Sequence, residues 1–197
     1  MALSPQHASE RPAVYTVGHS TRTILEFVEL LKRGLVELVV DIRSVPRSRT
    51  NPQFNLDALP QALAVWQIGH MQIPELGGLR RKSKIVPPEV NGFWINQSFH
   101  NYADYALSRE FHLGFSRLLE VSQTRRCAIM CSEAVWWRCH RRIVADYLLH
   151  DGRSVFHLMG IERVEPATLT QAATAHGEML VYPAGEAPGR LPPGVAW

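Results

Sequence analysis

The sequence predicts an α/β fold, a single three-layer domain with a mainly parallel central sheet that is Rossmann-like and doubly wound. Residues 13–44 read as strand, helix and strand within about thirty residues, the pattern of a βαβ unit. The second strand, "LVELVVDIRS", is apolar on both faces, as is typical of a strand buried in a parallel sheet. A chain of 197 residues is also long enough to bury one hydrophobic core.

The first βαβ unit carries clear helix signals. The segment "AVYTVGHS" is a short strand rich in β-branched residues, and apolar residues follow at helical spacing over 24–31. Thr23 followed by Glu26 has the form of a capping box, although Ser20 is an equally good N-cap. Gly34 is a natural end for this helix.

The same reading extends along the rest of the chain. In order, the sequence predicts a helix over 56–67, a short strand over 69–74, an irregular Gly-, Pro- and base-rich stretch over 75–97, one or two helices over 99–123 interrupted near Gly114, a central strand over 126–132, a helix over 133–152 closed by Gly152, and a last clear strand over 154–160. Beyond residue 165 we expect a short helix and an edge strand over 178–183. The domain is predicted to span 13–183, with irregular termini at 1–12 and 184–197.

Composition limits the functional classes. No apolar run reaches the length of a membrane span, so a membrane partner is not expected. The segment "MALSPQHASERP" lacks the apolar centre of a signal peptide, and three cysteines are an odd number, so we expect reduced thiols in the cytoplasm. A net charge of +3 is too small by itself to indicate a nucleic-acid partner, and the sequence leaves the oligomeric state open.

Polar residues gather where the predicted strands end. They are His19 and Ser20 after the first strand, Asp41, Arg43 and Ser44 after the second, and Cys131, Ser132 and Glu133 after the fourth. Because the carboxyl ends of parallel strands meet at one edge, we expect these residues to line one crevice. A helix begins after each strand, and its free N–H groups favour an anion there.

Basic residues lie in segments that could border this crevice. They are Arg43, Arg47 and Arg49, then Arg80, Arg81, Lys82 and Lys84, then Arg138, Arg141 and Arg142. They predict a phosphate-containing small molecule or a nucleic acid as partner, although solvated charge on loops is the alternative. The anion-binding residues that we predict are Ser20, Arg43, Arg49, Arg138 and Arg141, while the role of segment 80–84 stays open.

Two kinds of catalysis fit the strand ends. His19, Asp41 and Glu133 would make an acid/base set. Cys131 stands at the junction of a strand and a helix, where a helix N-terminus can lower the pKa of a thiol. However, six residues without a glycine separate Cys131 from Arg138, which does not fit the anion loop of phosphatase-like thiol enzymes, and a buried structural thiol is an equal alternative.

The sequence also contains candidate ligands for a metal and candidate contacts for a substrate. Cys131, Cys139 and His140 are possible zinc ligands, with His19 as a distant fourth, but the close Cys-x-x-Cys pair of structural zinc sites is missing. We therefore predict no metal site, and the sequence assigns no cofactor. Residues predicted to line the substrate are Tyr102, Tyr105, Trp137 and His140, although core packing is the alternative for the tyrosines and for the histidine.

Five motifs in order resemble the bacterial and archaeal family catalogued as domain of unknown function 488. The motifs are "TVGHS", "DIRSVPRSR", "ELGG", "NYADYA" and "CSEAVWWRCHRRIVADYLLHDGRSVFHL", and the resemblance spans about residues 13–183. It implies a compact α/β domain and no settled activity. The positions that match the family pattern are Gly18, His19, Ser20, Asp41, Arg43, Pro46, Ser48, Arg49, Gly77, Gly78, Tyr102, Tyr105, Cys131, Glu133, Cys139, His140 and Arg141.

The function that these observations favour is an enzyme that acts on a phosphate-containing substrate, either a nucleotide or a nucleic acid. Hydrolysis of a phosphoester and hydrolysis of an N-glycosidic bond both fit, and the sequence does not choose between them. Two alternatives stay open: a module that binds nucleic acid without catalysis, and a thiol-dependent enzyme that uses Cys131.

Overall fold

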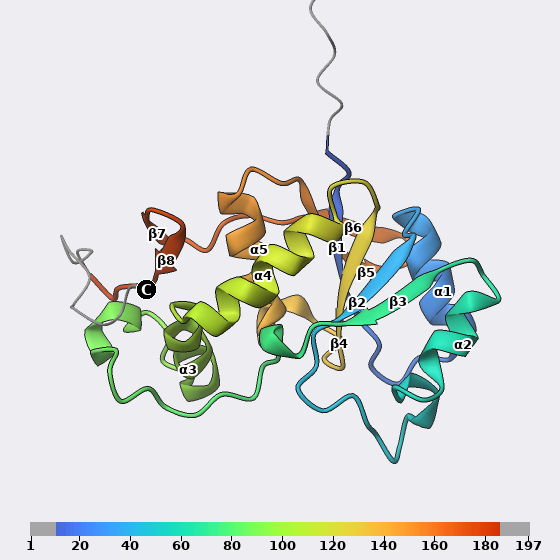
Figure 1. Ribbon diagram of the computed structural model, residues 1–197, viewed down its shortest axis with the longest axis horizontal. Helices are drawn as coiled ribbons and strands as arrows, with labels where there is room; N and C mark the ends of the chain where they lie inside the picture. The colour runs from blue at the N-terminus through green and yellow to red at the C-terminus, as the bar shows by residue number, and fades with distance from the viewer. Residues whose placement is uncertain (1–10, 186–197) are drawn as a thin grey trace, which may run out of the picture.

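The computed structural model describes residues 11–185, which form a central sheet covered by helices on both faces (Figure 1). The sheet has six strands in the order β3-β2-β4-β1-β5-β6. Its strands are β1 (Val14–Gly18), β2 (Leu38–Asp41), β3 (Gly69–Gln72), β4 (Cys127–Cys131), β5 (Val155–Gly160) and β6 (Arg163–Pro166). All neighbours pair in parallel except β5 and β6. The predicted Rossmann-like α/β class is confirmed.

Helices connect the parallel strands. The α-helices are α1 (Ile24–Arg33), α2 (Leu59–Ala64), α3 (Gln97–Ala106), α4 (Arg109–Val121) and α5 (Arg141–His150), and short 3-10 turns lie at η1 (Pro52–Phe54), η2 (Pro74–Leu76), η3 (Pro88–Asn91) and η4 (Trp136–Arg138). Helix α1 begins with the predicted capping box, in which Thr23 accepts from the Glu26 amide and Glu26 accepts from Thr23. It ends at Gly34, also as predicted.

Alternation along the strands divides the core into two layers. On β2, Val39 packs in the cluster formed with α1 and α2, whereas Val40 packs in the cluster formed with α3, α4 and α5. Successive side chains of a strand point to opposite faces, so a strand that is covered twice must be apolar throughout. Figure 1 shows α1 and α2 on one side of the sheet and α3–α5 on the other.

The chain changes direction between β1 and β4. From β1 the chain passes through α1 to β2, toward the β3 edge of the sheet. From β4 it passes through α5 to β5, toward the β6 edge. Since β1 and β4 are neighbours, their carboxyl ends form a topological switch point, which is where open α/β sheets bind ligands.

Two predicted helices have different boundaries. The interruption within 99–123 lies at Leu107 and Ser108, where the Ser108 hydroxyl accepts from the Phe111 amide and starts α4, and not near Gly114. Gly114 is inside α4, and a Cβ there would lie 2.7 Å from Glu75 Cβ, so this glycine allows close packing and does not break the helix.

The helix predicted over 133–152 begins only at Arg141. The reason is tertiary: the Trp136 ring stacks on His157 at 4.4 Å, and its Nε1 donates to Glu165 at 3.3 Å. These contacts with β5 and β6 hold residues 132–140 in a loop with one 3-10 turn. Gly152 follows the helix with a φ of +78°, consistent with its predicted role as the closing residue.

The segment beyond β5 also differs from the prediction. No helix lies between residues 165 and 185 of the described chain; instead β6 pairs with β5, and β7 (Thr174–His176) and β8 (Met179–Val181) form a hairpin. The sequence of β6, "RVEP", lacks the apolar alternation of a half-buried strand, which is why it was missed. The predictions for residues 1–10 and 186–197 lie outside the described residues.

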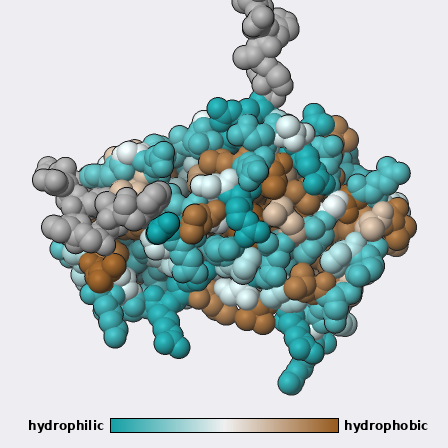
Figure 2. Space-filling view, in the orientation of Figure 1, coloured by the Kyte–Doolittle hydropathy of each residue, from teal (hydrophilic) through white to brown (hydrophobic). Residues whose placement is uncertain are grey.

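Membrane insertion through a helix finds no support in residues 11–185, because none of their helices is long and apolar enough to cross a bilayer. In the face shown by Figure 2, hydrophobic residues form separate patches among hydrophilic ones.

The buried His157 makes folding sensitive to acid. Its Nδ1 lies 2.8 Å from Thr16 Oγ1, and burial together with the nearby Arg141 charge lowers its pKa to about 4. The unfolded chain has a histidine pKa of about 6.5, so below that pH the unfolded state binds the extra proton. We expect the free energy of unfolding to fall as the pH falls from about 6.5 to about 4. The His157→Phe variant keeps an aromatic ring against Trp136 but cannot take up this proton. In urea titrations at several pH values, its free energy of unfolding should fall less steeply with pH, by the contribution of one proton. An unchanged dependence on pH would contradict this.

Candidate functional site

A cavity of about 610 Å³ opens at the carboxyl ends of β1, β2 and β4. Its walls come from the segments that follow these three strands, from the loop around Gly78 and from the start of α3. Residues far apart in sequence therefore meet at the switch point of the sheet, as the strand order requires.

Backbone hydrogen bonds beyond β1 and β4 fix two of these walls to each other. The amide of His19 donates to Cys131 O at 3.0 Å, and the amide of Ser20 donates to Ser132 O at 3.0 Å. Ser20 has a φ of 50°, in the left-handed region that non-glycine residues rarely occupy. Strained backbone of this kind collects at functional sites, and here it lies in the cavity wall.

Arg43 joins three segments behind the cavity. Its Nη2 donates to Asp41 Oδ2 at 2.6 Å and to the Phe54 carbonyl at 2.6 Å, and its Nε donates to Asp41 Oδ1 at 2.9 Å. Its Nη1 lies 3.2 Å from His19 Nε2. The Arg43 side chain is 5% exposed and borders the cavity, and these hydrogen bonds hold its guanidinium in one orientation.

Asp41 is fully buried at the end of β2 and serves as the partner of Arg43. Burial alone would raise its pKa, but the nearby His70 ring and the hydrogen bonds and charge of Arg43 outweigh this and lower the pKa below its usual value. His70 Nε2 is 3.8 Å from Asp41 Oδ2, an electrostatic contact longer than a hydrogen bond. Asp41 lies outside the cavity lining, and its described contacts position Arg43.

His19 lines the cavity as a neutral ring. Burial, with the Arg43 charge adding to it, lowers its pKa to about 4, although the bond to the Ser20 carbonyl opposes this. A guanidinium only donates and a carbonyl only accepts. Nδ1 therefore carries the proton and donates to Ser20 O at 2.8 Å, while Nε2 accepts from Arg43. The ring also stacks on Phe54, with the ring centroids 4.2 Å apart.

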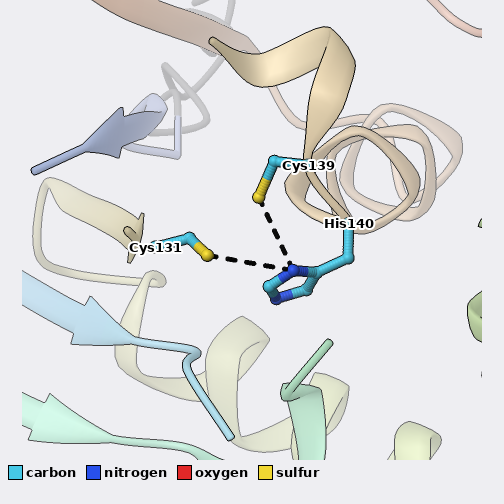
Figure 3. Close-up of side chains that lie close together, drawn as sticks. All are labelled: Cys131, Cys139 and His140. Atoms are coloured by element: carbon cyan, nitrogen blue, oxygen red, sulfur yellow. Dashed lines mark hydrogen bonds between the residues drawn. The ribbon is translucent and has the colours of Figure 1, made fainter. Parts of the chain in front are cut away.

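Two cysteines converge on one histidine in the opposite wall (Figure 3). The Sγ of Cys139 is 3.5 Å from His140 Nδ1, and the Sγ of Cys131 is 3.9 Å from the same atom. On the other side of the ring, His140 Nε2 lies 3.0 Å from the Ile42 carbonyl, so Nε2 carries the proton and Nδ1 presents its lone pair to the sulfurs. All three residues line the cavity.

The thiol with the lowered pKa is Cys139, whereas the sequence suggested Cys131. Burial opposes ionisation of Cys139, but hydrogen bonding from Cys131 and the charge and hydrogen bonds of Arg141 lower its pKa to about 6. Its hydrogen bond with Cys139, together with burial, raises the pKa of Cys131 to about 11. Of the two thiols, Cys139, just before the start of α5, is therefore the one that ionises more readily.

Of the five residues predicted to bind an anion, the structure places three in the cavity lining: Ser20, Arg43 and Arg138. Arg49 is exposed and lies outside the lining. Arg141 is fully buried, and donates to the Glu133 carbonyl and, at 3.3 Å, to Cys139 Sγ. Among the predicted catalytic residues, His19, Cys131 and Glu133 line the cavity.

Only some of the predicted substrate-lining residues lie in the cavity wall. Of these, His140 lines the cavity. Tyr102 donates to the Leu76 carbonyl at 2.7 Å, and Tyr105 donates to the Glu75 carbonyl at 2.6 Å, so both fix the turn that leads into Gly77 and Gly78. Trp137 is 41% exposed and packs edge-on against Trp136, outside the lining.

Within the basic segment 80–84, Arg80 has a structural role next to the cavity. Its guanidinium lies 3.6 Å from the centre of the Tyr105 ring, and its Nε donates to the Gly77 carbonyl at 2.8 Å. Arg80 therefore braces the Gly77–Gly78 loop. A Cβ at Gly78 would come within 2.4 Å of His140 Nδ1, so this loop packs directly on the histidine ring.

Several lining residues were not among the predicted site residues. They include Thr21, Val45, Arg47, Ser48, Asn51, Gly78, Leu79, Ser98, Phe99 and Cys139, whereas Ser44 and Ser132 had been expected in the crevice as strand-end residues. Arg47 had a usable signal, because it lies in the basic segment that follows β2. Ser98 and Phe99 had none, because they reach the cavity through the packing of α3.

Comparison with known proteins gave one match. A family model described as "Domain of unknown function DUF488" matches residues 23–148, more than half of the chain. A search of curated proteins and a search of solved structures each found no match. The matched range includes the loop after β2, the Gly77–Gly78 loop and the cysteine–histidine cluster. The chain therefore belongs to the family of proteins with the domain of unknown function DUF488.

Proposed function

We propose that this protein is an enzyme that acts on a phosphate-containing substrate in the cavity at the ends of β1, β2 and β4. The charge of the wall carries the proposal. The described lining residues include three arginines, Arg43, Arg47 and Arg138, and one carboxylate, that of Glu133. The buried Asp41 carboxylate balances the charge of Arg43, so Arg47 and Arg138 supply the excess positive charge. Guanidinium groups bind phosphate through paired hydrogen bonds and charge, so this imbalance favours an anionic substrate.

The size of the cavity favours a nucleotide. Small-molecule sites have volumes of about 300–1,000 Å³, and the cavity of about 610 Å³ lies within that range. A nucleic acid would have to place one unstacked nucleotide inside it. A free nucleotide enters without that cost, and is the substrate class that we favour.

The lining residues divide into two proposed roles. Arg47 and Arg138 are exposed at the cavity and would reach a phosphate, while Arg43, whose charge Asp41 balances, would hold the wall behind them in place. Glu133 is half-buried in the wall and would act as general base or acid. His19, whose two ring nitrogens already bond Ser20 and Arg43, would position Arg43. This set serves hydrolysis of a phosphoester and of an N-glycosidic bond equally.

The Arg47→Ala variant should bind nucleotides about 10-fold more weakly, since one charge-assisted contact contributes about 1.4 kcal/mol. Calorimetric titration with nucleoside mono-, di- and triphosphates measures this, and binding should weaken as salt rises. Arg49→Ala is the matched comparison, because Arg49 is two residues away, exposed and outside the lining.

Three results would count against the proposal. If Arg49→Ala loses as much affinity as Arg47→Ala, the anion lies outside the cavity. If the unmodified protein binds no nucleotide, the phosphate class is wrong. If oligonucleotides bind with a steep salt dependence and no substrate is turned over, a non-catalytic nucleic-acid-binding module is the better description.

A further inference from the structure

We propose that Cys131, Cys139 and His140 bind a zinc ion whose fourth coordination position opens into the cavity. The sequence alone argued against a metal here, because it lacks a close Cys-x-x-Cys pair. The fold nevertheless brings these three residues together, since Cys131 ends β4 while Cys139 and His140 directly precede α5. The proposal stands on the geometry of these ligands and does not depend on the identity of the substrate.

The distances within the cluster fit a tetrahedral metal. The two sulfurs and His140 Nδ1 all lie within 4.8 Å of one another, with sulfur–nitrogen distances of 3.5 and 3.9 Å. Zinc bonds of about 2.3 Å to sulfur and about 2.0–2.1 Å to nitrogen, at tetrahedral angles, place the two ligand atoms about 3.6 Å apart. Figure 3 shows the three side chains converging on one point.

The histidine is already oriented as a metal ligand. Its Nε2–H donates to the Ile42 carbonyl at 3.0 Å, which leaves the Nδ1 lone pair directed at the sulfurs. Histidines that bind metals nearly always donate their other N–H to such a partner. The Nδ1 lone pair can accept from only one of the two sulfurs, whereas a cation between the three atoms would bind all of them.

Arg141 places a buried positive charge against Cys139, which favours the thiolate form of this ligand. Its side chain is fully buried, and no carboxylate within residues 11–185 forms an ion pair with it. Its backbone amide and its Nε both point at Cys139 Sγ, at 3.5 and 3.3 Å. The guanidinium also donates to the neutral Glu133 carbonyl, so Cys139 is the described contact of Arg141 that can carry a balancing negative charge. Thiolate is the form in which cysteine binds zinc.

The number and kind of ligands indicate the metal and its role. Two thiolates and one imidazole suit zinc, and three protein ligands with an open position are the arrangement of catalytic rather than structural zinc sites. All three residues line the cavity, so the open position faces any bound substrate. A zinc there would bind water or polarise a substrate oxygen.

Metal analysis of the full chain tests the proposal directly. Protein purified with a reducing agent and without chelator should contain one zinc per chain by elemental analysis. After removal of zinc, addition of cobalt(II) should produce a sulfur-to-cobalt charge-transfer band. Both Cys131→Ser and Cys139→Ser should weaken zinc binding by about 100-fold or more in a chelator competition, because even the loss of an outer partner costs 10–100-fold.

Cys127→Ser is the matched control. Cys127 is also buried, but its Sγ lies near the Val121 and Arg125 carbonyls, at 3.7 and 3.5 Å, and not in the cluster. This variant should bind zinc like the unmodified chain, and an equal loss in it would overturn the proposal. If the cluster variants do not fold, the unmodified chain still decides: no zinc and no charge-transfer band would overturn the proposal. Neither result depends on nucleotide binding, so the two proposals can fail separately.

Discussion

The Arg43→Leu variant is expected to lose about 3–5 kcal/mol of its free energy of unfolding, because it leaves the Asp41 carboxylate buried without its partner. Asp41 is fully buried, and its closest contact is the 2.6 Å ion pair with Arg43 Nη2. The Phe54 carbonyl and His19 Nε2 lose a hydrogen bond as well. Urea unfolding at neutral pH measures the loss.

Two further variants separate the buried pair from general damage to the loop. Arg47→Leu changes an exposed arginine of the same loop and should alter stability by no more than about 0.5 kcal/mol. The double variant Asp41→Leu/Arg43→Leu should be more stable than Arg43→Leu alone, since an apolar pair leaves no charge unpaired. A single Arg43→Leu variant that loses less than about 1 kcal/mol would show that Asp41 is stabilised by something else.

The second large effect is expected from Gly18→Ala. A Cβ at this position would lie 1.9 Å from the Glu133 carbonyl oxygen and 2.9 Å from the Ala134 Cα. Both atoms belong to the backbone, so no side chain can rotate away, and the loop after β4 must move. We expect a loss of about 3 kcal/mol, at the upper end of overpacking effects. Because the same loop carries Glu133 into the cavity, ligand binding should weaken as well.

Gly160→Ala is the control for this change. Gly160 also ends a strand of the sheet, yet the nearest atom to an added Cβ is Arg163 Cβ at 3.9 Å, an ordinary contact. This variant should unfold at nearly the same urea concentration as the unmodified protein, or slightly higher because alanine restricts the unfolded chain. Equal losses in the two variants would mean that the crowding at Gly18 is not the cause.

The sequence was informative wherever one periodic pattern decides the structure. β2 is apolar on both faces and β1 and β2 flank a helix, so a parallel sheet follows from the pattern, and the carboxyl ends of its strands must then meet. His19, Cys131 and Glu133, which follow these strands, accordingly line one cavity. The predicted start of α5 was wrong because Trp136 stacks on His157. Local helix propensity does not reveal this contact between distant segments.

The pairing of Asp41 with Arg43 had a signal that could have been used. Residues two apart on an extended chain point to the same side, so an aspartate and an arginine at this spacing are placed to pair. Cys139 is different, because its position depends on where α5 begins and on the buried Arg141. Only the three-dimensional structure brings it to Cys131.

The position of β1 determines how this protein can be divided. The family match begins at residue 23, after β1, and ends within α5. β1 nevertheless lies between β4 and β5 and bonds to both, and its Val14 and Val17 belong to opposite cores. A fragment cut at the limits of the match would leave β4 as an unprotected edge with apolar surface on both faces, open to pairing with other chains. We therefore expect a fragment that folds on its own to extend beyond the matched residues and to include β1 and β5.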